Sequence, residues 1–281
     1  MKKLYAILPL LALLPLLFSC GETELGETVF DDPLYMDHAC RLTPSEGGTK
    51  APAVLQEATL AGNIASIELT ESGLYVIGRL TSGTDNTAYS YGHYNVSDDL
   101  YTLQGFGTLR FENTRSDAVG LTITPQNSTP QTVEATLTKA ASNNPAYRTW
   151  HVEKTRLTVK GWTTASVDFS GCNFKEIADF LKRNGNKVPN DVPNRSISSI
   201  TLTGTESMIL IYDDGTVDMN EFSLAGNTLS YNWNDGSLGF TFQSERAEIE
   251  YMDGRCILTM EVRILNSTTS GSISFVLTPM N

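Results

Sequence analysis

Residues that commonly carry chemistry are few in this chain of 281 residues. The three histidines are His38, His93 and His151, and none stands at metal-ligand spacing from another histidine or from a cysteine. The chain also contains no nucleophile-elbow, P-loop or H-E-x-x-H motif. We therefore predict that the protein is not an enzyme and that it carries no cofactor or metal.

Three pairs of adjacent carboxylates occur at positions 31–32, 98–99 and 213–214. A glycosidase draws its two carboxylates from different elements that face each other across a cleft, whereas adjacent side chains at a turn point apart. The stretch from Asp213 to Asp218 also lacks the alternating oxygen ligands of a calcium loop. Turn formation is enough to explain all three pairs.

Aromatic side chains are the candidates for ligand contact. Trp150, Trp233, Tyr94 and Tyr231 accompany strand-like stretches and could line a pocket for a small apolar ligand or a glycan. The same residue types fill β cores and form cross-strand pairs, so both interpretations stay open. The alternative function is a structural or adhesive protein that contacts other proteins and holds no small ligand.

The four cysteines have different expected roles. Cys20 is considered below with the N-terminal segment, which leaves the odd number of Cys40, Cys172 and Cys256. In an oxidising compartment, Cys172 and Cys256 are the candidates for a disulfide, with Cys40 left unpaired. The alternative is that they are small buried residues, because cysteine is among the most buried residue types.

The N-terminus has the pattern of a secretory signal peptide at residues 1–19. A basic start with Lys2 and Lys3 precedes an almost wholly apolar run from Leu4 to Phe18. A transmembrane helix needs about 20 apolar residues, and this run is shorter. We therefore exclude these residues from the fold.

The end of that run, Leu17-Phe18-Ser19-Cys20, resembles the lipobox of bacterial lipoproteins. The resemblance implies cleavage after Ser19 and lipid on the Cys20 sulfur, so that acyl chains hold the protein in the lipid bilayer of the outer membrane. More than one chain makes such attachment durable. The acids after Cys20 resemble the export signal of surface lipoproteins, which favours a location facing outside the cell.

Composition supports a tethered, acidic protein. The polar, acidic stretch at residues 20–59 cannot bury much apolar surface, so we expect a flexible tether there. The chain holds 20 basic and 32 acidic residues, with a formal net charge of −12. Nucleic-acid binding depends on basic side chains that neutralise phosphates, so this class of partner is excluded.

Downstream of the tether the pattern is β almost throughout. Short β-branched and aromatic runs separated by turn residues predict a first antiparallel β unit at 60–140. Residues 197–203 closely match residues 64–70, and later hairpins recur in the same order. We therefore predict an all-β protein with a tandem duplication, whose second unit lies at 147–281, each unit being a barrel or a sandwich.

One helix interrupts the β pattern of the second unit. Residues 173–184 are predicted to be helical, because Asn173 can cap the helix, Glu176 takes the capping-box position and Gly185 can end it. The opening strand with Trp150 and the hairpin turns that follow make the second unit resemble lipocalin-like lipoproteins of unassigned function. The resemblance implies an up-and-down barrel.

Overall fold

The structure, a computed structural model, describes the greater part of the chain. The described residues are 37–45, 63–81, 87–115, 117–141, 144–160, 164–231, 240–264 and 269–280. The predicted signal peptide, Cys20, most of the predicted tether and Trp233 lie outside the described residues.

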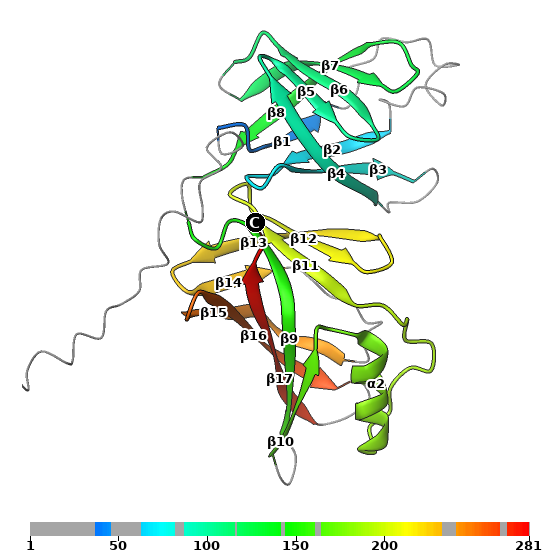
Figure 1. Cartoon of the computed structure of the whole chain (residues 1–281), viewed down its shortest axis with the longest axis vertical. Helices are drawn as coiled ribbons and strands as arrows, with labels where there is room; N and C mark the ends of the chain where they lie inside the picture. The colour runs from blue at the N-terminus through cyan, green and yellow to red at the C-terminus, as the bar shows by residue number, and fades with distance from the viewer. Residues whose placement is uncertain are drawn as a thin grey trace, which may run out of the picture.

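The first unit is a closed barrel of antiparallel strands, each paired with its neighbours in sequence (Figure 1). Strand β1 completes the ring by pairing with β8, which places Cys40 opposite Lys139 and Leu42 opposite Leu137. The strands are β1 (Cys40–Pro44), β2 (Ile64–Leu69), β3 (Leu74–Leu80), β4 (Thr87–Ser97), β5 (Leu100–Leu103), β6 (Gly107–Glu112), β7 (Ala118–Pro125) and β8 (Gln131–Lys139).

The second unit repeats this ring, which β9 closes by pairing with both β11 and β17. β10 adds to the part of β9 that extends beyond the β11 pairing. The elements are β9 (Thr149–Lys160), β10 (Thr164–Ser170), α2 (Phe174–Arg183), β11 (Ile197–Leu202), β12 (Ser207–Tyr212), β13 (Val217–Ala225), β14 (Thr228–Tyr231), β15 (Phe240–Met252), β16 (Arg255–Ile264) and β17 (Ser270–Pro279).

The predicted all-β fold with two tandem units and one short helix is therefore confirmed, and the units are lipocalin-like barrels. The boundary between the tether and the first unit was wrong. β1 lies inside the stretch assigned to the tether, where Cys40 and Leu42 point into the barrel and are 4% and 0% exposed. Two apolar residues in a short polar stretch are a weak signal, but they complete the ring between β2 and β8.

The internal repeat is confirmed by strand order, because β1–β8 correspond one by one to β9 and β11–β17. The turn between the second and third strands contains the same hydrogen bond in both barrels. The amide of Leu74 donates to Thr70 Oγ1 at 3.1 Å, and the amide of Ser207 donates to Thr203 Oγ1 at 3.0 Å. Each threonine thus closes the turn between the second and third strands of its barrel.

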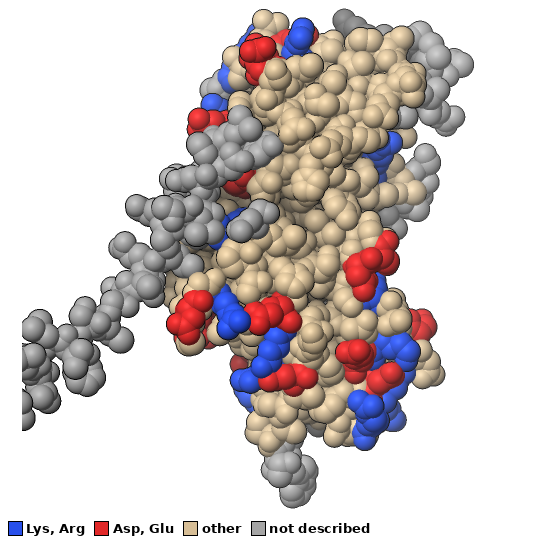
Figure 2. Space-filling view, in the orientation of Figure 1, with Lys and Arg blue, Asp and Glu red and all other residues tan. Residues whose placement is uncertain are grey.

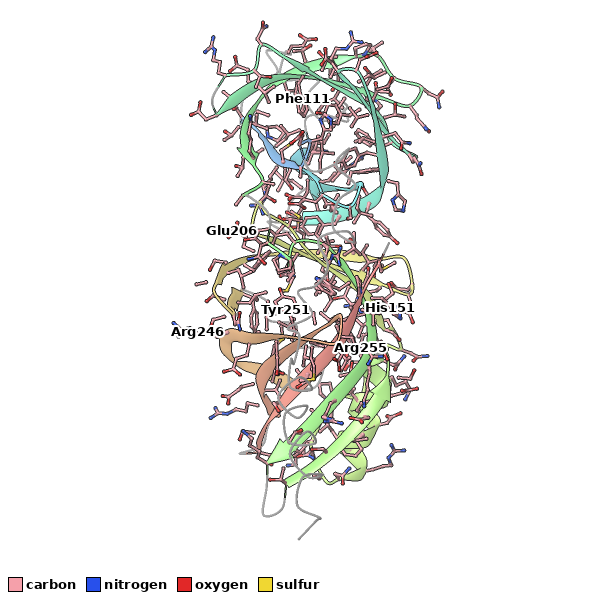
Figure 3. All side chains as sticks on the ribbon, turned by 60° about the vertical axis from the view of Figure 1, so that its left-hand side comes forward. Phe111, His151, Glu206, Arg246, Tyr251 and Arg255 are labelled. Carbon is pink, nitrogen blue, oxygen red and sulfur yellow. The ribbon has the colours of Figure 1, made fainter. Side chains whose placement is uncertain are left out.

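Both barrel interiors are filled by their own side chains (Figure 3). In the second barrel Trp150 is 0% exposed, and its indole N–H donates to the carbonyl of Ala146 at 3.0 Å. Tyr251, labelled in Figure 3, lies beside it with ring centroids 6.5 Å apart. In the first barrel Tyr94 is 1% exposed, and its hydroxyl donates to the carbonyl of Thr70 at 2.9 Å.

Helix α2 begins and ends where the sequence predicts. The Glu176 amide donates to Asn173 Oδ1 at 3.0 Å, which satisfies one unpaired N–H of the first turn. The apolar face, with Phe174, Ile177 and Leu181, joins the core of the second barrel. Among the described residues no helix is long and apolar enough to cross a membrane.

Closure of the second barrel depends on close approach of β9 and β17. A Cβ at Gly271 would lie 2.0 Å from the carbonyl oxygen of Thr158, so the strands must separate if it is added. We expect Gly271→Ala to reduce the free energy of unfolding by roughly 1–3 kcal/mol, as overpacking does. The neighbouring Ser272→Ala is the control, and equal stability of the two variants in urea titrations would contradict this explanation.

Candidate functional site

The two barrels meet through corresponding faces. An apolar cluster joins Leu74 and Val76 of β3 to Ile209 and Ile211 of β12 and Val217 of β13. Val76 and Ile209 occupy equivalent positions, since each lies two residues into the third strand of its barrel. A contact that uses the same patch on both partners is isologous, as in a two-fold dimer. The duplicated units therefore pack like the two halves of a dimer within one chain.

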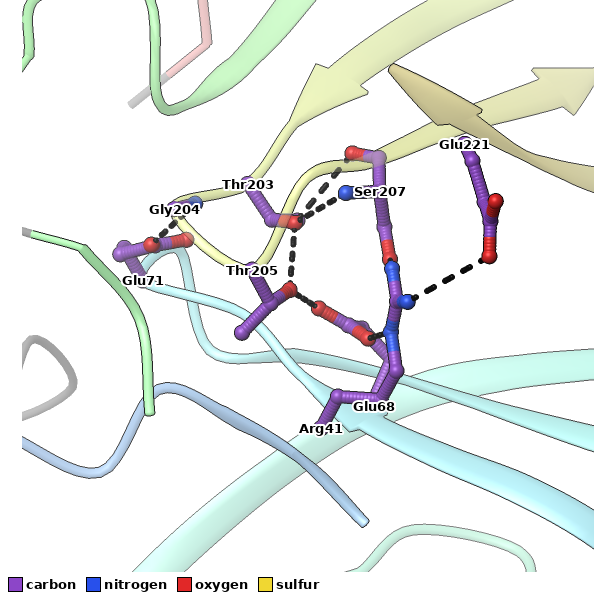
Figure 4. A network of polar contacts seen from close by, with 8 residues as sticks. All are labelled: Arg41, Glu68, Glu71, Thr203, Gly204, Thr205, Ser207 and Glu221. Carbon is purple, nitrogen blue, oxygen red and sulfur yellow. Dashed lines mark hydrogen bonds and ion pairs between the residues drawn. The ribbon is translucent and has the colours of Figure 1, made fainter. Parts of the chain in front are cut away.

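A polar network lies beside this apolar cluster (Figure 4). Arg41 Nε donates to Glu68 Oε2 at 3.0 Å, within the first barrel. The same guanidinium donates to the Ser207 hydroxyl of the second barrel and lies 4.0 Å from Glu221 Oε1. The Thr205 hydroxyl donates to Glu68 Oε1, so both oxygens of this carboxylate are hydrogen-bonded.

Glu68 is the most buried charged side chain of the network, at 0% exposure. Burial raises its pKa, and the hydrogen bonds from Thr205 and Arg41 act against that rise. An isolated buried carboxylate is costly, whereas a paired and fully hydrogen-bonded one is tolerated. Arg41 and Thr205 therefore make the burial of Glu68 compatible with a closed junction.

Glu71 lies at the same junction, but its carboxylate has fewer hydrogen-bond partners than that of Glu68. Its Oε1 accepts a hydrogen bond from the Gly204 amide at 2.8 Å, while its buried Oε2 has no hydrogen-bond partner among the described residues. Burial raises the pKa of this carboxyl to about 7. Gly204 permits the approach of Glu71, because a Cβ there would lie 2.9 Å from Glu71 Oε1 and 2.6 Å from the Ala141 carbonyl oxygen.

A cleft of about 380 Å³ opens where the network reaches the surface. One wall is Arg41 of the first barrel, and the rest comes from the second barrel. Its lining residues are Arg41, Glu206, Glu221, Phe222, Ser223, Ser230 and Tyr231. Both barrels therefore contribute to a polar cleft that neither one has alone.

Glu206, labelled in Figure 3 at the junction, has a strained backbone with φ of 65°. The equivalent turn of the first barrel has Gly73 at this position, with φ of 73°. Left-handed backbone costs most residues roughly 1–2 kcal/mol, and glycine avoids that cost. The second barrel thus keeps an exposed carboxylate at the cleft in a conformation that suits glycine better.

The described aromatic residues among those proposed for ligand contact are divided between the two barrel cores and do not form a common pocket. Tyr94 lies in the core of the first barrel, and Trp150 and Tyr231 lie in the core of the second. Of these described residues Tyr231 alone reaches the cleft, and it is 4% exposed. Trp233 lies outside the described residues. Core filling, the other interpretation of these residues, is what the structure shows for Trp150 and Tyr94.

The possible disulfide between Cys172 and Cys256 is not formed, and the alternative of small buried residues is what the structure shows. Both are free thiols, as is Cys40, and all three are buried. Burial raises the pKa of each thiol to about 12. Cys172 precedes α2 and Cys256 faces inward on β16, so they belong to the core as small apolar residues.

The network residues were missed at the sequence level, although a signal existed. Glu68 interrupts the apolar run Ile67-Glu68-Leu69, where the matching segment of the second barrel has Thr201. A single acidic residue in such a run indicates a special environment, but it does not identify Arg41 or Thr205 as partners. Among the described residues no group of His, Cys, Asp and Glu could hold a metal ion.

Neither models of protein families nor curated proteins match the chain. The cleft and the junction therefore carry the functional argument by themselves.

Removal of Arg41 should be far more costly than removal of an exposed arginine. Arg41→Met leaves Glu68 buried without its cation, and we expect a loss of roughly 3–5 kcal/mol in the free energy of unfolding. Arg156→Met is the control, since Arg156 Nε donates to Asp168 at 2.7 Å on an exposed surface. That variant should lose much less.

The double variant Arg41→Met/Glu68→Leu gives a second readout of the same pair. It removes the stranded carboxylate as well, so it should be more stable than Arg41→Met alone. Urea titration of the three variants measures the difference. A double variant no more stable than the single one would contradict a compensating role for Arg41.

Proposed function

We propose that this protein is a lipid-anchored protein of the bacterial cell envelope that binds a polar, hydroxyl-rich ligand such as a glycan in the cleft between its barrels. The observation that carries the proposal is the cleft itself, with Glu206 held there at a conformational cost. Strained residues are kept where function requires them, and they cluster at binding sites. The proposed activity is binding rather than catalysis.

The chemistry of the cleft favours a polar ligand over an apolar one. Glu206 and Glu221 are exposed acceptors, Arg41 is a donor, and the hydroxyls of Ser223 and Ser230 can do both. The rings of Phe222 and Tyr231 are each 4% exposed, so they support the floor and offer little face for stacking. The filled barrel interiors also leave the apolar side chains engaged with one another.

The charged side chains of the cleft are Arg41, Glu206 and Glu221, of both signs, so the cleft has no strong charge of one sign. On the face shown in Figure 2, charged side chains gather over the second barrel, and uncharged residues cover much of the first barrel and the junction. A hydroxyl-rich ligand needs no strong electrostatic attraction, and hydrogen bonds from fixed side chains suffice for orientation.

We further propose that acyl chains on Cys20 hold the barrels at the outer surface of the outer membrane. Because β1 begins at Cys40, the connecting segment is shorter than the tether predicted from composition. Such a segment could span at most about 70 Å when fully extended. This reach keeps the cleft close to the cell surface, where envelope glycans are available.

A second candidate is contact with other proteins. β10 forms the edge of its sheet, with β9 as its hydrogen-bonded neighbour. An edge strand offers backbone donors and acceptors to a strand of another chain. This candidate predicts that partner binding depends on β10 and is insensitive to changes in the cleft.

Glu206→Gly separates stability from binding. Relief of the left-handed strain should leave the free energy of unfolding unchanged or raise it by up to about 1 kcal/mol. On a glycan array, the affinity of this variant for the glycans that the unaltered protein binds should fall at least about tenfold, which corresponds to a loss of about 1.4 kcal/mol of binding free energy. Asp253→Gly, at another turn with φ of 51°, is the matched control and should keep binding.

The outcome on the array decides between the two candidates. Equal binding by Glu206→Gly and Asp253→Gly would contradict a ligand site in the cleft. Absence of any glycan signal, with a pull-down that is lost on Val167→Pro in β10, would favour the protein-contact candidate, because proline removes a strand donor.

The proposed anchor is tested independently of the ligand. Cys20→Ala should abolish incorporation of radiolabelled fatty acid and release the protein from the membrane fraction, because attachment rests on the acyl chains. Protease treatment of intact cells measures surface exposure of the unaltered protein. Full membrane retention of Cys20→Ala would contradict lipid anchoring at this residue.

A further inference from the structure

The junction between the barrels holds two carboxylates that both reach across it. Glu68 accepts from the Thr205 hydroxyl, and Glu71 accepts from the Gly204 amide at 2.8 Å (Figure 4). Arg41 is the one cation drawn in this network, and its Nε is bound to Glu68. Glu71 therefore contacts the opposite barrel without a cation of its own in the network.

The titratable groups near Glu71 come from several elements of both barrels. Glu68 on β2 raises its pKa by repulsion, in addition to burial. From the second barrel's side, Tyr147 interacts with both Glu71 and Glu206. Cys40 of β1 interacts with Glu68, with Glu71 and with Lys139 at the end of β8. The two cations of this region engage other groups: Lys139 acts on Cys40, and Arg41 is paired with Glu68.

We propose that the contact between the barrels is proton-sensitive: Glu71 docks against the Gly204 turn as a neutral acid, and its ionisation loosens the junction. The geometry points to this, because the buried Oε2 has no hydrogen-bond partner among the described residues, so that an ionised Glu71 would be hydrogen-bonded at Oε1 but not at Oε2. The neutral acid keeps the hydrogen bond that its Oε1 accepts from Gly204 at much lower desolvation cost.

The direction of the pH effect follows from the change in proton affinity. Burial raises the pKa of Glu71 from 4.5 to about 7, and the contact with the Gly204 turn contributes to that burial. The stabilisation of the junction is therefore complete below pH 4.5 and is lost as the pH rises through 7. This shift corresponds to a change of up to about 300-fold in the docking equilibrium. A loosened junction also alters the cleft, because Arg41 lies on one side of it and Glu206 on the other.

Energy transfer between dyes on the two barrels measures the docking. Ser128 and Lys187 are exposed on the first and second unit, and Ser128→Cys/Lys187→Cys provides labelling sites in a chain whose other described cysteines are buried. With Cys20 replaced by alanine, transfer efficiency is followed from pH 4 to pH 9. We expect a single change centred near pH 7, with closer docking at lower pH.

Glu71→Gln is the decisive variant, since an amide stays neutral and of similar shape throughout the titration. It should remain docked from pH 4 to pH 9, so the transition should disappear. Glu206→Gln is the matched control, because it changes an exposed carboxylate of the opposing turn and should keep the transition. A transition caused by another group, such as a histidine, would be seen in both variants.

Two results would overturn the proposal. One is a transfer efficiency that does not change between pH 4 and pH 9 in the labelled chain that keeps Glu71. The other is a transition that persists in Glu71→Gln. If that variant fails to fold, carbon NMR of the Glu71 carboxyl in the unaltered chain replaces it, and an ordinary pKa there would also overturn the proposal. Glycan binding plays no part in these readouts, so they stand or fall separately from the proposed ligand.

Discussion

The burial of Glu68 between two barrels is the constraint on which the rest of the junction depends. A carboxylate at 0% exposure requires compensation, and it receives this from Arg41 within its own barrel and from Thr205 of the other. Arg41 in turn approaches Ser207 and Glu221, which brings it to the edge of the cleft. Arg41 therefore pairs with the buried carboxylate, contacts the second barrel and lines the candidate ligand site.

Duplication explains why such a junction exists and why it is not symmetrical. Equivalent third strands supply Val76 and Ile209 to one apolar cluster, as expected of an isologous contact. The polar residues around it have diverged, with Glu68 in one barrel where Thr201 stands in the other. The contact keeps the geometry of a dimer. Because the two repeats can differ in sequence, an acid can lie on one side of the contact and its partner on the other.

The proposed ligand site and the proton-sensitive contact use different residues of the same junction. The cleft depends on exposed Glu206 and Glu221, whereas docking depends on Glu71 and the Gly204 turn. Because the cleft spans both barrels, a change in their docking must change its width. Because the barrel interiors are filled, the proposed ligand site lies at this boundary rather than in a central cavity.

The sequence by itself determined the local features: alternating strands, the helix capped by Asn173, the repeat of two units and the lipobox-like end at Cys20. These depend on neighbouring residues, so a linear pattern contains them. Tertiary structure alone decided that β1 belongs to a barrel, that Cys172 and Cys256 are unpaired, and that Trp150 fills a core. It also joined Glu68 to Thr205, 137 residues apart, because the burial that makes such a pair necessary exists only after the barrels pack.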